Sequence, residues 1–124
     1  MGNAMKCILM GGSGQVGGAV ARALLASDVC ARLTLLGRRG VPALQGLEKV
    51  EQQVVDTAAD DFEDVARKAA AGHDAGICCL GIGHGTLFMD AAAMAAVEVT
   101  LAGRFARGCR AAGIETFQIG RAHV

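Results

Sequence analysis

A glycine-rich turn near the N-terminus constrains the fold of this chain more than any other segment. An apolar run at residues 6–10 leads into it, and a helical pattern follows at once. Gly12, Gly14 and Gly17 fit the pattern G-x-G-x-x-G, and Gly11 opens the looser pattern G-x-x-G-x-x-G. Glycine has no Cβ and tolerates positive φ, so it lets a strand end, turn tightly and leave bare backbone open to a diphosphate. The helix after the turn would aim free N–H groups at the same place, which predicts an anion site.

The rest of the chain alternates strand-like and helix-like patterns. Strands are expected at 6–10, 33–36, 50–55, 74–80 and 114–119, helices at 15–27, 60–71 and 88–112, and a loop with a short helical turn at 41–48. The third strand carries polar residues, which is typical of a sheet edge. The alternation predicts an α/β fold of Rossmann type, three layers (α/β/α) around a mostly parallel, truncated sheet of about five strands.

Composition excludes several classes of protein. The chain has 124 residues, which is enough for one domain, and 52% of them are hydrophobic. Twelve basic and twelve acidic residues give a net charge of zero, which argues against a nucleic-acid or membrane partner held by bulk charge. No apolar stretch reaches the roughly 18–20 residues of a membrane span, and no secretory signal is present. Five cysteines without a C-x-x-C pair indicate reduced thiols and a cytoplasmic protein.

Two glycine-rich loops define the expected site. In open α/β sheets a ligand binds beyond the carboxyl ends of the strands, where the strand order reverses. The turn after the first strand and the loop at 81–85 after the fourth would form the two sides of that crevice. The predicted ligand is a dinucleotide, with a packing-only glycine turn as the alternative. The candidate residues in these loops are Gly11, Gly12, Ser13, Gly14, Gln15, Val16, Gly17, Leu80 and Gly81.

The end of the second strand indicates which dinucleotide. An NAD site usually has an acid there to bind the ribose 2′-OH, whereas this chain has Arg38 and Arg39. A guanidinium pairs with a 2′-phosphate, so the sequence favours NADP(H) over NAD(H), unless both arginines are merely solvated loop residues. Asp56, after the third strand, is a candidate for the adenine amino group or an ordinary turn aspartate.

Other chemistries are disfavoured. The Gly-Lys-Ser/Thr of a P-loop is absent, and so is metal-ligand spacing of His, Cys and acids. His84 could act as an acid or base, but a histidine in a glycine loop is more often just exposed to solvent. Cys78 and Cys79 are expected to pack in the core and not to act as nucleophiles. No catalytic residue and no metal ligand is assigned.

Five blocks of sequence are similar to one known family. They are residues 10–17 (Met-Gly-Gly-Ser-Gly-Gln-Val-Gly), 33–39 (Leu-Thr-Leu-Leu-Gly-Arg-Arg), 54–56 (Val-Val-Asp), 72–81 and 111–114. They resemble the atypical short-chain dehydrogenase/reductases, nearest to the TIP30-like (HTATIP2-like) NAD(P)-binding oxidoreductases, over about residues 5–117. The resemblance implies a Rossmann fold that binds NADPH through the glycine loop and the Arg38 region. It also implies a catalytic Ser and a Tyr-x-x-x-Lys pair beyond the fifth strand, and this chain has no tyrosine.

The resemblance therefore matches an N-terminal fragment, a partial NAD(P)-binding domain at 1–117. Residues 118–124 end in Ile-Gly-Arg-Ala-His-Val, which a sequencing adapter also encodes, so we expect a native product that continues past Phe117. An uncovered sheet edge would then favour self-association into a homo-oligomer. Three function classes stay open: the cofactor domain of a hydride-transferring oxidoreductase, a non-catalytic NADPH-sensing module, and the N-terminal domain of a semialdehyde-dehydrogenase-type enzyme. The residues do not indicate a small-molecule substrate.

Overall fold

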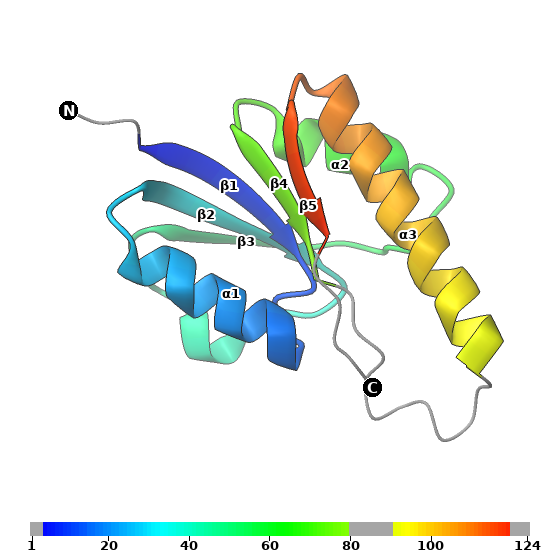
Figure 1. The fold of residues 1–124 in the computed structure, drawn as a ribbon, viewed down its shortest axis with the longest axis horizontal. Coiled ribbons are helices and arrows are strands. Elements are labelled where there is room, and N and C mark those ends of the chain that lie inside the picture. The colour runs from blue at the N-terminus through cyan, green and yellow to red at the C-terminus, as the bar shows by residue number, and fades with distance from the viewer. Residues whose placement is uncertain (1–3, 80–90, 120–124) are drawn as a thin grey trace.

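A computed structural model describes residues 4–79 and 91–119 of the chain, with the side chains of 4–79 and 100–118. Strands and helices alternate along it, as the sequence predicts (Figure 1). In chain order the elements are β1 (Met5–Met10), α1 (Gln15–Ala26), β2 (Cys30–Gly37), a 3-10 turn (Pro42–Leu44), β3 (Val50–Val54), α2 (Phe62–Ala70), β4 (Ala75–Cys78), α3 (Ala91–Ala111) and β5 (Thr116–Ile119).

The five strands form one parallel sheet in the order β3-β2-β1-β4-β5. The chain steps outward from β1 to β2 and β3, then returns to β4 on the other side of β1 and continues to β5. The strand order therefore reverses between β1 and β4, and the predicted Rossmann-type α/β fold is confirmed. The polar strand β3 lies at one edge of the sheet, as expected, and β5 lies at the other.

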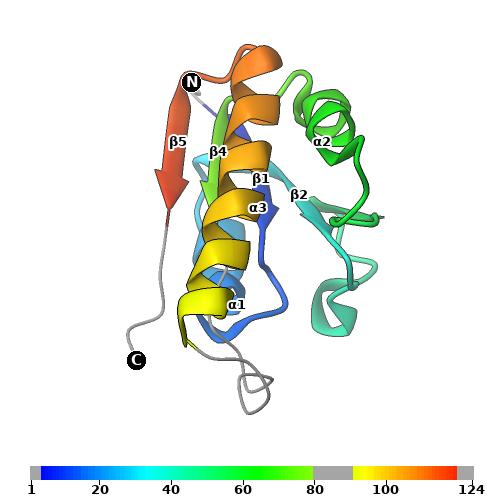
Figure 2. The ribbon, with the colours of Figure 1, turned by 90° about the vertical axis from the view of Figure 1, so that its right-hand side faces the viewer.

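Helices cover both faces of the sheet (Figure 2). In β1, Cys7 and Leu9 pack in the cluster that contains α1, whereas Ile8 and Met10 pack in the cluster that contains α2 and α3. Successive side chains of a strand point to opposite faces, so a strand buried on both sides must be apolar throughout. This is why the first strand reads as an unbroken apolar run.

The helix pair α2–α3 packs unusually closely at Gly108. A Cβ at this position would lie 2.7 Å from the Cβ of Ala66 and 2.7 Å from the carbonyl oxygen of Glu63. Glycine costs stability inside an isolated helix, and both Gly103 and Gly108 are expected to weaken α3 on that ground. The structure assigns Gly108 a packing role, whereas a Cβ at Gly103 would meet only the end of the flexible Arg107 side chain at 3.4 Å.

Element bounds differ from the sequence expectation where neighbouring strands decide them. The second strand was expected at 33–36 but spans Cys30–Gly37, because parallel pairing with β1 begins at Cys30. Helices α2 and α3 are followed by Gly72 and Gly113, with φ of +78° and +97°, which is the left-handed conformation that ends a helix. All five cysteines are buried thiols, as the sequence predicts.

The strand β5 extends past the expected domain boundary at residue 117. Gln118 and Ile119 pair with Ile77 and Cys78 of β4, so both residues belong to the sheet. Residues 120–124 lie outside the described residues. Whether copies of the chain associate through the β5 edge stays a prediction.

Candidate functional site

The glycine turn joins β1 to α1 at the carboxyl end of the sheet. Gly11 has a φ of +93°, the left-handed region that L side chains rarely adopt. The amide of Gly14 donates to the Gly11 carbonyl oxygen at 3.1 Å, which closes the turn. The first glycine of the looser pattern is thus required by backbone conformation.

Gly17 is required by packing. A Cβ here would lie 1.9 Å from the Gly11 carbonyl oxygen and 2.6 Å from its carbonyl carbon, so no other residue fits without moving the turn. Gly12 is also tight, because a Cβ there would lie 3.2 Å from Cδ2 of Leu35. Gly14 differs, since its Cβ would make only an ordinary 3.5 Å contact with the Gly11 oxygen. Neither positive φ nor crowding within the described protein demands glycine at position 14.

The start of α1 leaves backbone donors exposed to this turn. Gly14 is the N-cap residue and offers no side chain to cap the helix, and the first turn contains no acid. The first N–H groups of a helix have no carbonyl partner within it. Ser13, Gly14 and Gln15 are exposed, and Val16 is half-buried against the α1 face of the sheet. The amides that begin α1 therefore lie at an exposed part of the turn. An anion would find both partial positive charge and donors here.

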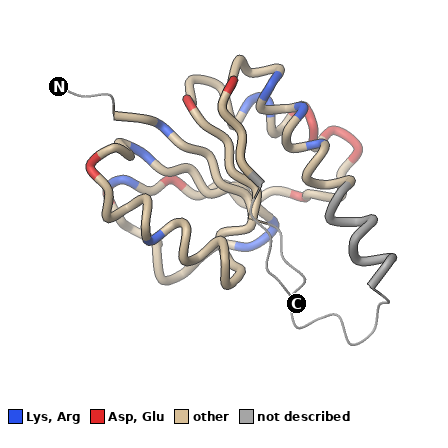
Figure 3. Tube along the Cα trace, viewed as in Figure 1, with Lys and Arg blue, Asp and Glu red and all other residues tan. Residues whose placement is uncertain are grey.

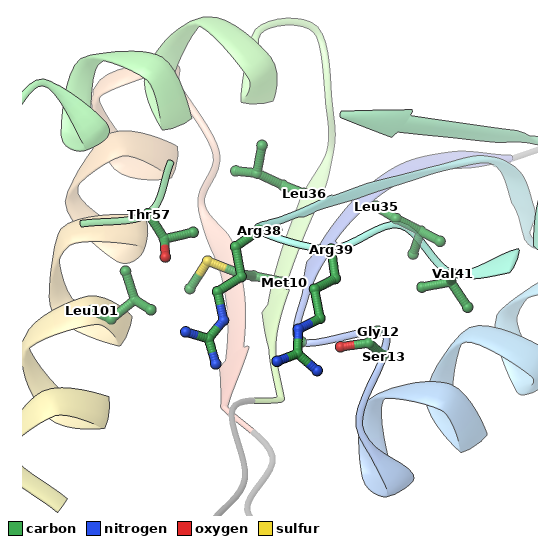
Figure 4. Close-up of a pocket in the computed structure, with 12 residues that line it drawn as sticks. Met10, Gly12, Ser13, Leu35, Leu36, Arg38, Arg39, Val41, Thr57 and Leu101 are labelled. Atoms are coloured by element: carbon green, nitrogen blue, oxygen red, sulfur yellow. The ribbon is translucent and has the colours of Figure 1, made fainter. Parts of the chain in front are cut away.

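A pocket of about 90 Å³ lies beside the turn (Figure 4). Its lining comes from the glycine turn, the end of β2, the segment after β3, and α3. The lining residues are Met10, Gly11, Gly12, Ser13, Leu35, Leu36, Gly37, Arg38, Arg39, Val41, Thr57 and Leu101. Ligand pockets typically measure roughly 300–1,000 Å³, so this pocket alone is too small to enclose a whole dinucleotide.

Both predicted arginines line this pocket. Arg38 and Arg39 follow the last residue of β2, and Figure 4 shows their guanidinium groups on the same side of the sheet, Arg39 toward Ser13 and Arg38 toward Leu101. Within the described residues neither guanidinium has an ion-pair or hydrogen-bond partner. The sheet thus brings the two arginines next to a glycine turn more than twenty residues earlier in the chain.

Asp56 does not line this pocket, although its neighbour Thr57 does. The Oδ1 atom of Asp56 accepts the Ala58 amide at 3.0 Å, so the carboxylate begins a turn. Its proposed contact with adenine stays a prediction. The sequence analysis missed Thr57, because a single threonine after a strand matches no binding motif. It also missed Leu101, although its spacing of four from the buried Phe105 indicates the inner face of a helix.

The residues expected to form the opposite wall of the crevice lie outside the described residues. Leu80, Gly81, the loop at 81–85 and His84 all belong to that segment. The amide of Cys79 donates to the Met10 carbonyl oxygen at 2.8 Å, so the chain leaves β4 directly beside the start of the glycine turn. The sheet order therefore supports the pairing of the two loops as far as the described chain extends.

Charge and metal ligands add little to this site. Basic and acidic residues are interspersed over the described elements (Figure 3), in line with the net charge of zero. The parts of the chain that the structure describes contain no group of three or more His, Cys, Asp or Glu residues able to hold a metal ion. Among the same residues, no helix is long and apolar enough to span a lipid bilayer.

Comparison with known proteins gives curated relatives and many structural neighbours. The chain is homologous to Protein HTATIP2 of Rattus norvegicus, with 36% identity over 76 residues, which cover 59% of this chain and 29% of that protein. No family model matches the chain. The match thus spans less than a third of the length of the curated relative.

The structural neighbours share the fold over nearly the whole chain. A putative epimerase from Bacteroides thetaiotaomicron has a TM-score of 0.69 at 19% identity, covering 94% of this chain and 47% of the neighbour. A Citrobacter sp. triphenylmethane reductase, complexed with NADP(H), has a TM-score of 0.64 at 19% identity, covering 92% of this chain and 36% of the neighbour. Pen from Bacillus thuringiensis has a TM-score of 0.72 at 12% identity, covering 92% of this chain and 37% of the neighbour.

Proposed function

We propose that this chain is the NADP(H)-binding domain of an oxidoreductase of the short-chain dehydrogenase/reductase superfamily. The observation that carries the proposal is the meeting of the glycine turn with Arg38 and Arg39 in one pocket. Homology to Protein HTATIP2, and a shared fold with a reductase complexed with NADP(H), support the same class.

The residues present suit the diphosphate of a dinucleotide. The uncapped start of α1 supplies backbone donors, and Gly14 leaves its surface open, since a Cβ there would contact no side chain of the described protein. Gly11, Gly12, Ser13, Gly14, Gln15, Val16 and Gly17 would form this part of the site. Backbone amides at a helix N-terminus bind phosphate groups in many nucleotide-binding proteins.

The adenosine end would lie in the pocket. Met10, Leu36 and Leu101 supply an apolar side on which an adenine ring would rest, with Thr57 beside them. The exposed guanidinium groups of Arg38 and Arg39 would bind a ribose 2′-phosphate, which NADP(H) has and NAD(H) lacks. Because arginine stands where an NAD site usually has an acid, the 2′-OH of NAD would also lack its carboxylate acceptor.

The bound nicotinamide would supply hydride-transfer chemistry. In this chain the described residues would bind and orient the adenosine and diphosphate parts of the cofactor. None of them is proposed to contact a substrate. Hydride transfer is proposed for a complete protein that contains the catalytic residues implied by the family resemblance.

Titration of the purified chain with NADPH and NADH, followed by calorimetry, tests this proposal. We expect NADPH to bind at least about tenfold more tightly, because a charge-assisted hydrogen bond contributes about 1.5–3 kcal/mol. Arg38→Ala and Arg39→Ala should each reduce this preference and leave NADH affinity nearly unchanged.

The matched control is Arg110→Ala, which removes an exposed arginine at the C-terminal end of α3. It should preserve the preference. Absence of binding by either dinucleotide would overturn the proposal, and equal affinities would remove the role given to the two arginines.

A further inference from the structure

We propose that Gln52 is a positioning residue that clamps the arginine loop, residues 38–40, and so determines preference for a 2′-phosphate. The inference rests on the proposed NADP(H) function and adds a residue from β3 that does not line the pocket. The Gln52 side-chain amide is the feature that carries it.

The amide of Gln52 makes two hydrogen bonds to one residue. Its Oε1 accepts the Val41 N–H at 2.7 Å, and its Nε2 donates to the Val41 carbonyl oxygen at 3.0 Å. A side chain that satisfies both backbone groups of one residue replaces the pairing that a further strand would provide. The clamp therefore fixes Val41 in position and orientation on the edge strand.

Val41 ends the arginine loop, and Gly37 begins it. The Val55 amide donates to the Gly37 carbonyl oxygen at 2.8 Å, which anchors the beginning of the loop to the segment after β3. Between these two anchors residues 38–40 are exposed, and within the described chain they have no other hydrogen bond. Loss of the Gln52 clamp would thus remove both hydrogen bonds that join this end of the loop to β3, and would leave only the local bond from the Leu44 amide to the Val41 carbonyl oxygen, at 3.0 Å, and the packing of the Val41 side chain.

The clamp also sets the distance between the loop and the glycine turn. A Cβ built on Gly12 would lie 3.7 Å from Cγ2 of Val41, so Val41 lies beside the turn, and both residues line the same pocket. The loop passes close to the clamp as well, because a Cβ on Gly40 would lie 3.4 Å from Oε1 of Gln52. Fixing Val41 therefore fixes where Arg38 and Arg39 stand relative to the diphosphate site.

A preorganised loop pays less ordering entropy when its arginines bind a phosphate. Without the clamp, this ordering entropy would weaken the binding of the 2′-phosphate by the arginines, and it would leave binding at the glycine turn unchanged. The expected signature is a loss of discrimination between two ligands that differ only in the 2′-phosphate, without a matching loss for the ligand that lacks it.

The test compares 2′,5′-ADP with 5′-AMP as probes, using wild type, Gln52→Met and Gln53→Met. Gln52→Met keeps the side-chain length and removes both hydrogen bonds. We expect the dissociation constant of 5′-AMP divided by that of 2′,5′-ADP to fall roughly three- to tenfold, while the affinity for 5′-AMP itself stays nearly unchanged. Gln53→Met is the matched control on the same strand, because Gln53 bonds only to Glu51, at 2.9 Å, and should keep the wild-type ratio.

A second measurement does not depend on the folding of a variant. In the wild-type chain the Val41 amide should exchange with solvent at least about tenfold more slowly than the amides of the exposed loop. Gln52→Asn, which is one methylene shorter, should abolish this protection and lower the ratio as Gln52→Met does.

The outcomes separate the two proposals. If the wild-type chain binds neither NADPH nor 2′,5′-ADP, the proposed function fails and this inference fails with it. If wild type prefers 2′,5′-ADP but Gln52→Met keeps the full preference, or weakens both ligands equally, only the role of Gln52 is overturned. An unprotected Val41 amide in wild type would overturn the clamp directly.

Discussion

The two ends of the parallel sheet treat their polar groups in opposite ways. At the amino end, side chains and backbone groups satisfy one another. At the carboxyl end, where the glycine turn and the arginine loop lie, the guanidinium groups of Arg38 and Arg39 have no hydrogen-bond or ion-pair partner among the described residues, and no side chain caps the start of α1. Both ends are formed by the same five strands, and they differ in how many of their polar groups are paired within the protein.

At the amino end, pairing is direct. Oδ2 of Asp74 accepts the Lys6 amide at 2.8 Å, and the Asp74 amide donates to the Lys6 carbonyl oxygen at 2.7 Å. The hydroxyl of Thr34, which is fully buried, lies 2.7 Å from Nε2 of His73. The other ring nitrogen of His73, Nδ1, lies 3.2 Å from the carbonyl oxygens of both Ala70 and Ala71, which can only accept, so Nδ1 is the donor.

At the carboxyl end, Arg38 and Arg39 line one pocket with residues 11–13 of the glycine turn, and the uncapped start of α1 follows that turn directly. Buried and half-buried polar groups are normally paired, and donors left for solvent in a concave site are available to a ligand. The amino end therefore pairs its polar groups within the protein, whereas the carboxyl end leaves two guanidinium groups for the dinucleotide that we propose.

The largest effect is expected from Gly17→Ala. Its Cβ would lie 1.9 Å from the Gly11 carbonyl oxygen, so the turn and α1 must move apart. We expect the free energy of unfolding to fall by about 3 kcal/mol and NADPH binding to be lost. Urea unfolding measures the first effect and calorimetry the second. A stable variant that still binds NADPH would show that the turn is not the rigid part of the site.

Thr34→Val tests the amino end. Removal of the hydroxyl leaves Nε2 of His73 without its partner, which should cost about 1–2 kcal/mol of unfolding free energy. A double-mutant cycle with His73→Ala should give a coupling of about 1 kcal/mol, measured by urea unfolding. NADPH affinity should stay within about twofold of wild type, and a larger change would contradict the separation of the two ends.

Gly14→Ala should have the opposite profile. Its Cβ makes only a 3.5 Å contact in the protein, so the free energy of unfolding should change by less than about 1 kcal/mol. Dinucleotide affinity should fall about tenfold, because the methyl group occupies the surface that the diphosphate would approach. Calorimetry with NADPH and with NADH should show the same loss for both. Unchanged affinity would place the diphosphate elsewhere.

The smallest effect concerns thiols buried between the two ends. Burial raises the pKa of Cys7 to about 11 and that of Cys109 to about 12, from an ordinary value of 9.0. The unfolded thiols ionise first, so the folded state loses stability as pH rises above about 9, by roughly 0.4 kcal/mol per thiol at pH 9. Urea unfolding at several pH values should show this decline, with Cys109→Ala reducing it. A stability that rises over this range would contradict the assignment.

Much of the fold could be predicted from local patterns. Apolar runs that end in glycine gave the strands, and spacing by three and four gave the helices. Exact bounds could not be predicted, because strand length depends on the neighbour, as the extension of β2 to Cys30 beside β1 shows. The reason for glycine at position 108 was also hidden, since it depends on a helix some forty residues earlier.

The candidate site divides in the same way. The glycine turn and the two arginines were predicted because each is a local motif at the end of a strand. Thr57 and Gln52 were not, because their positions beside the pocket and the loop come from distant elements, and the spacing of Leu101 indicates only a core position. Asp56 shows the converse, a plausible local signal whose carboxylate begins a turn.

Sequence alone predicted the alternation of elements, a candidate anion site at the turn and the basic end of the second strand, since each depends on residues close together in the chain. Only the tertiary structure decided that β1 lies between β2 and β4, and that Gly17 is needed for packing while Gly14 is left open. It also showed that the Gln52 side chain bonds both backbone groups of Val41, next to the loop of Arg38 and Arg39. These relations arise from hydrogen bonds and close contacts between segments far apart in sequence, which no local pattern encodes.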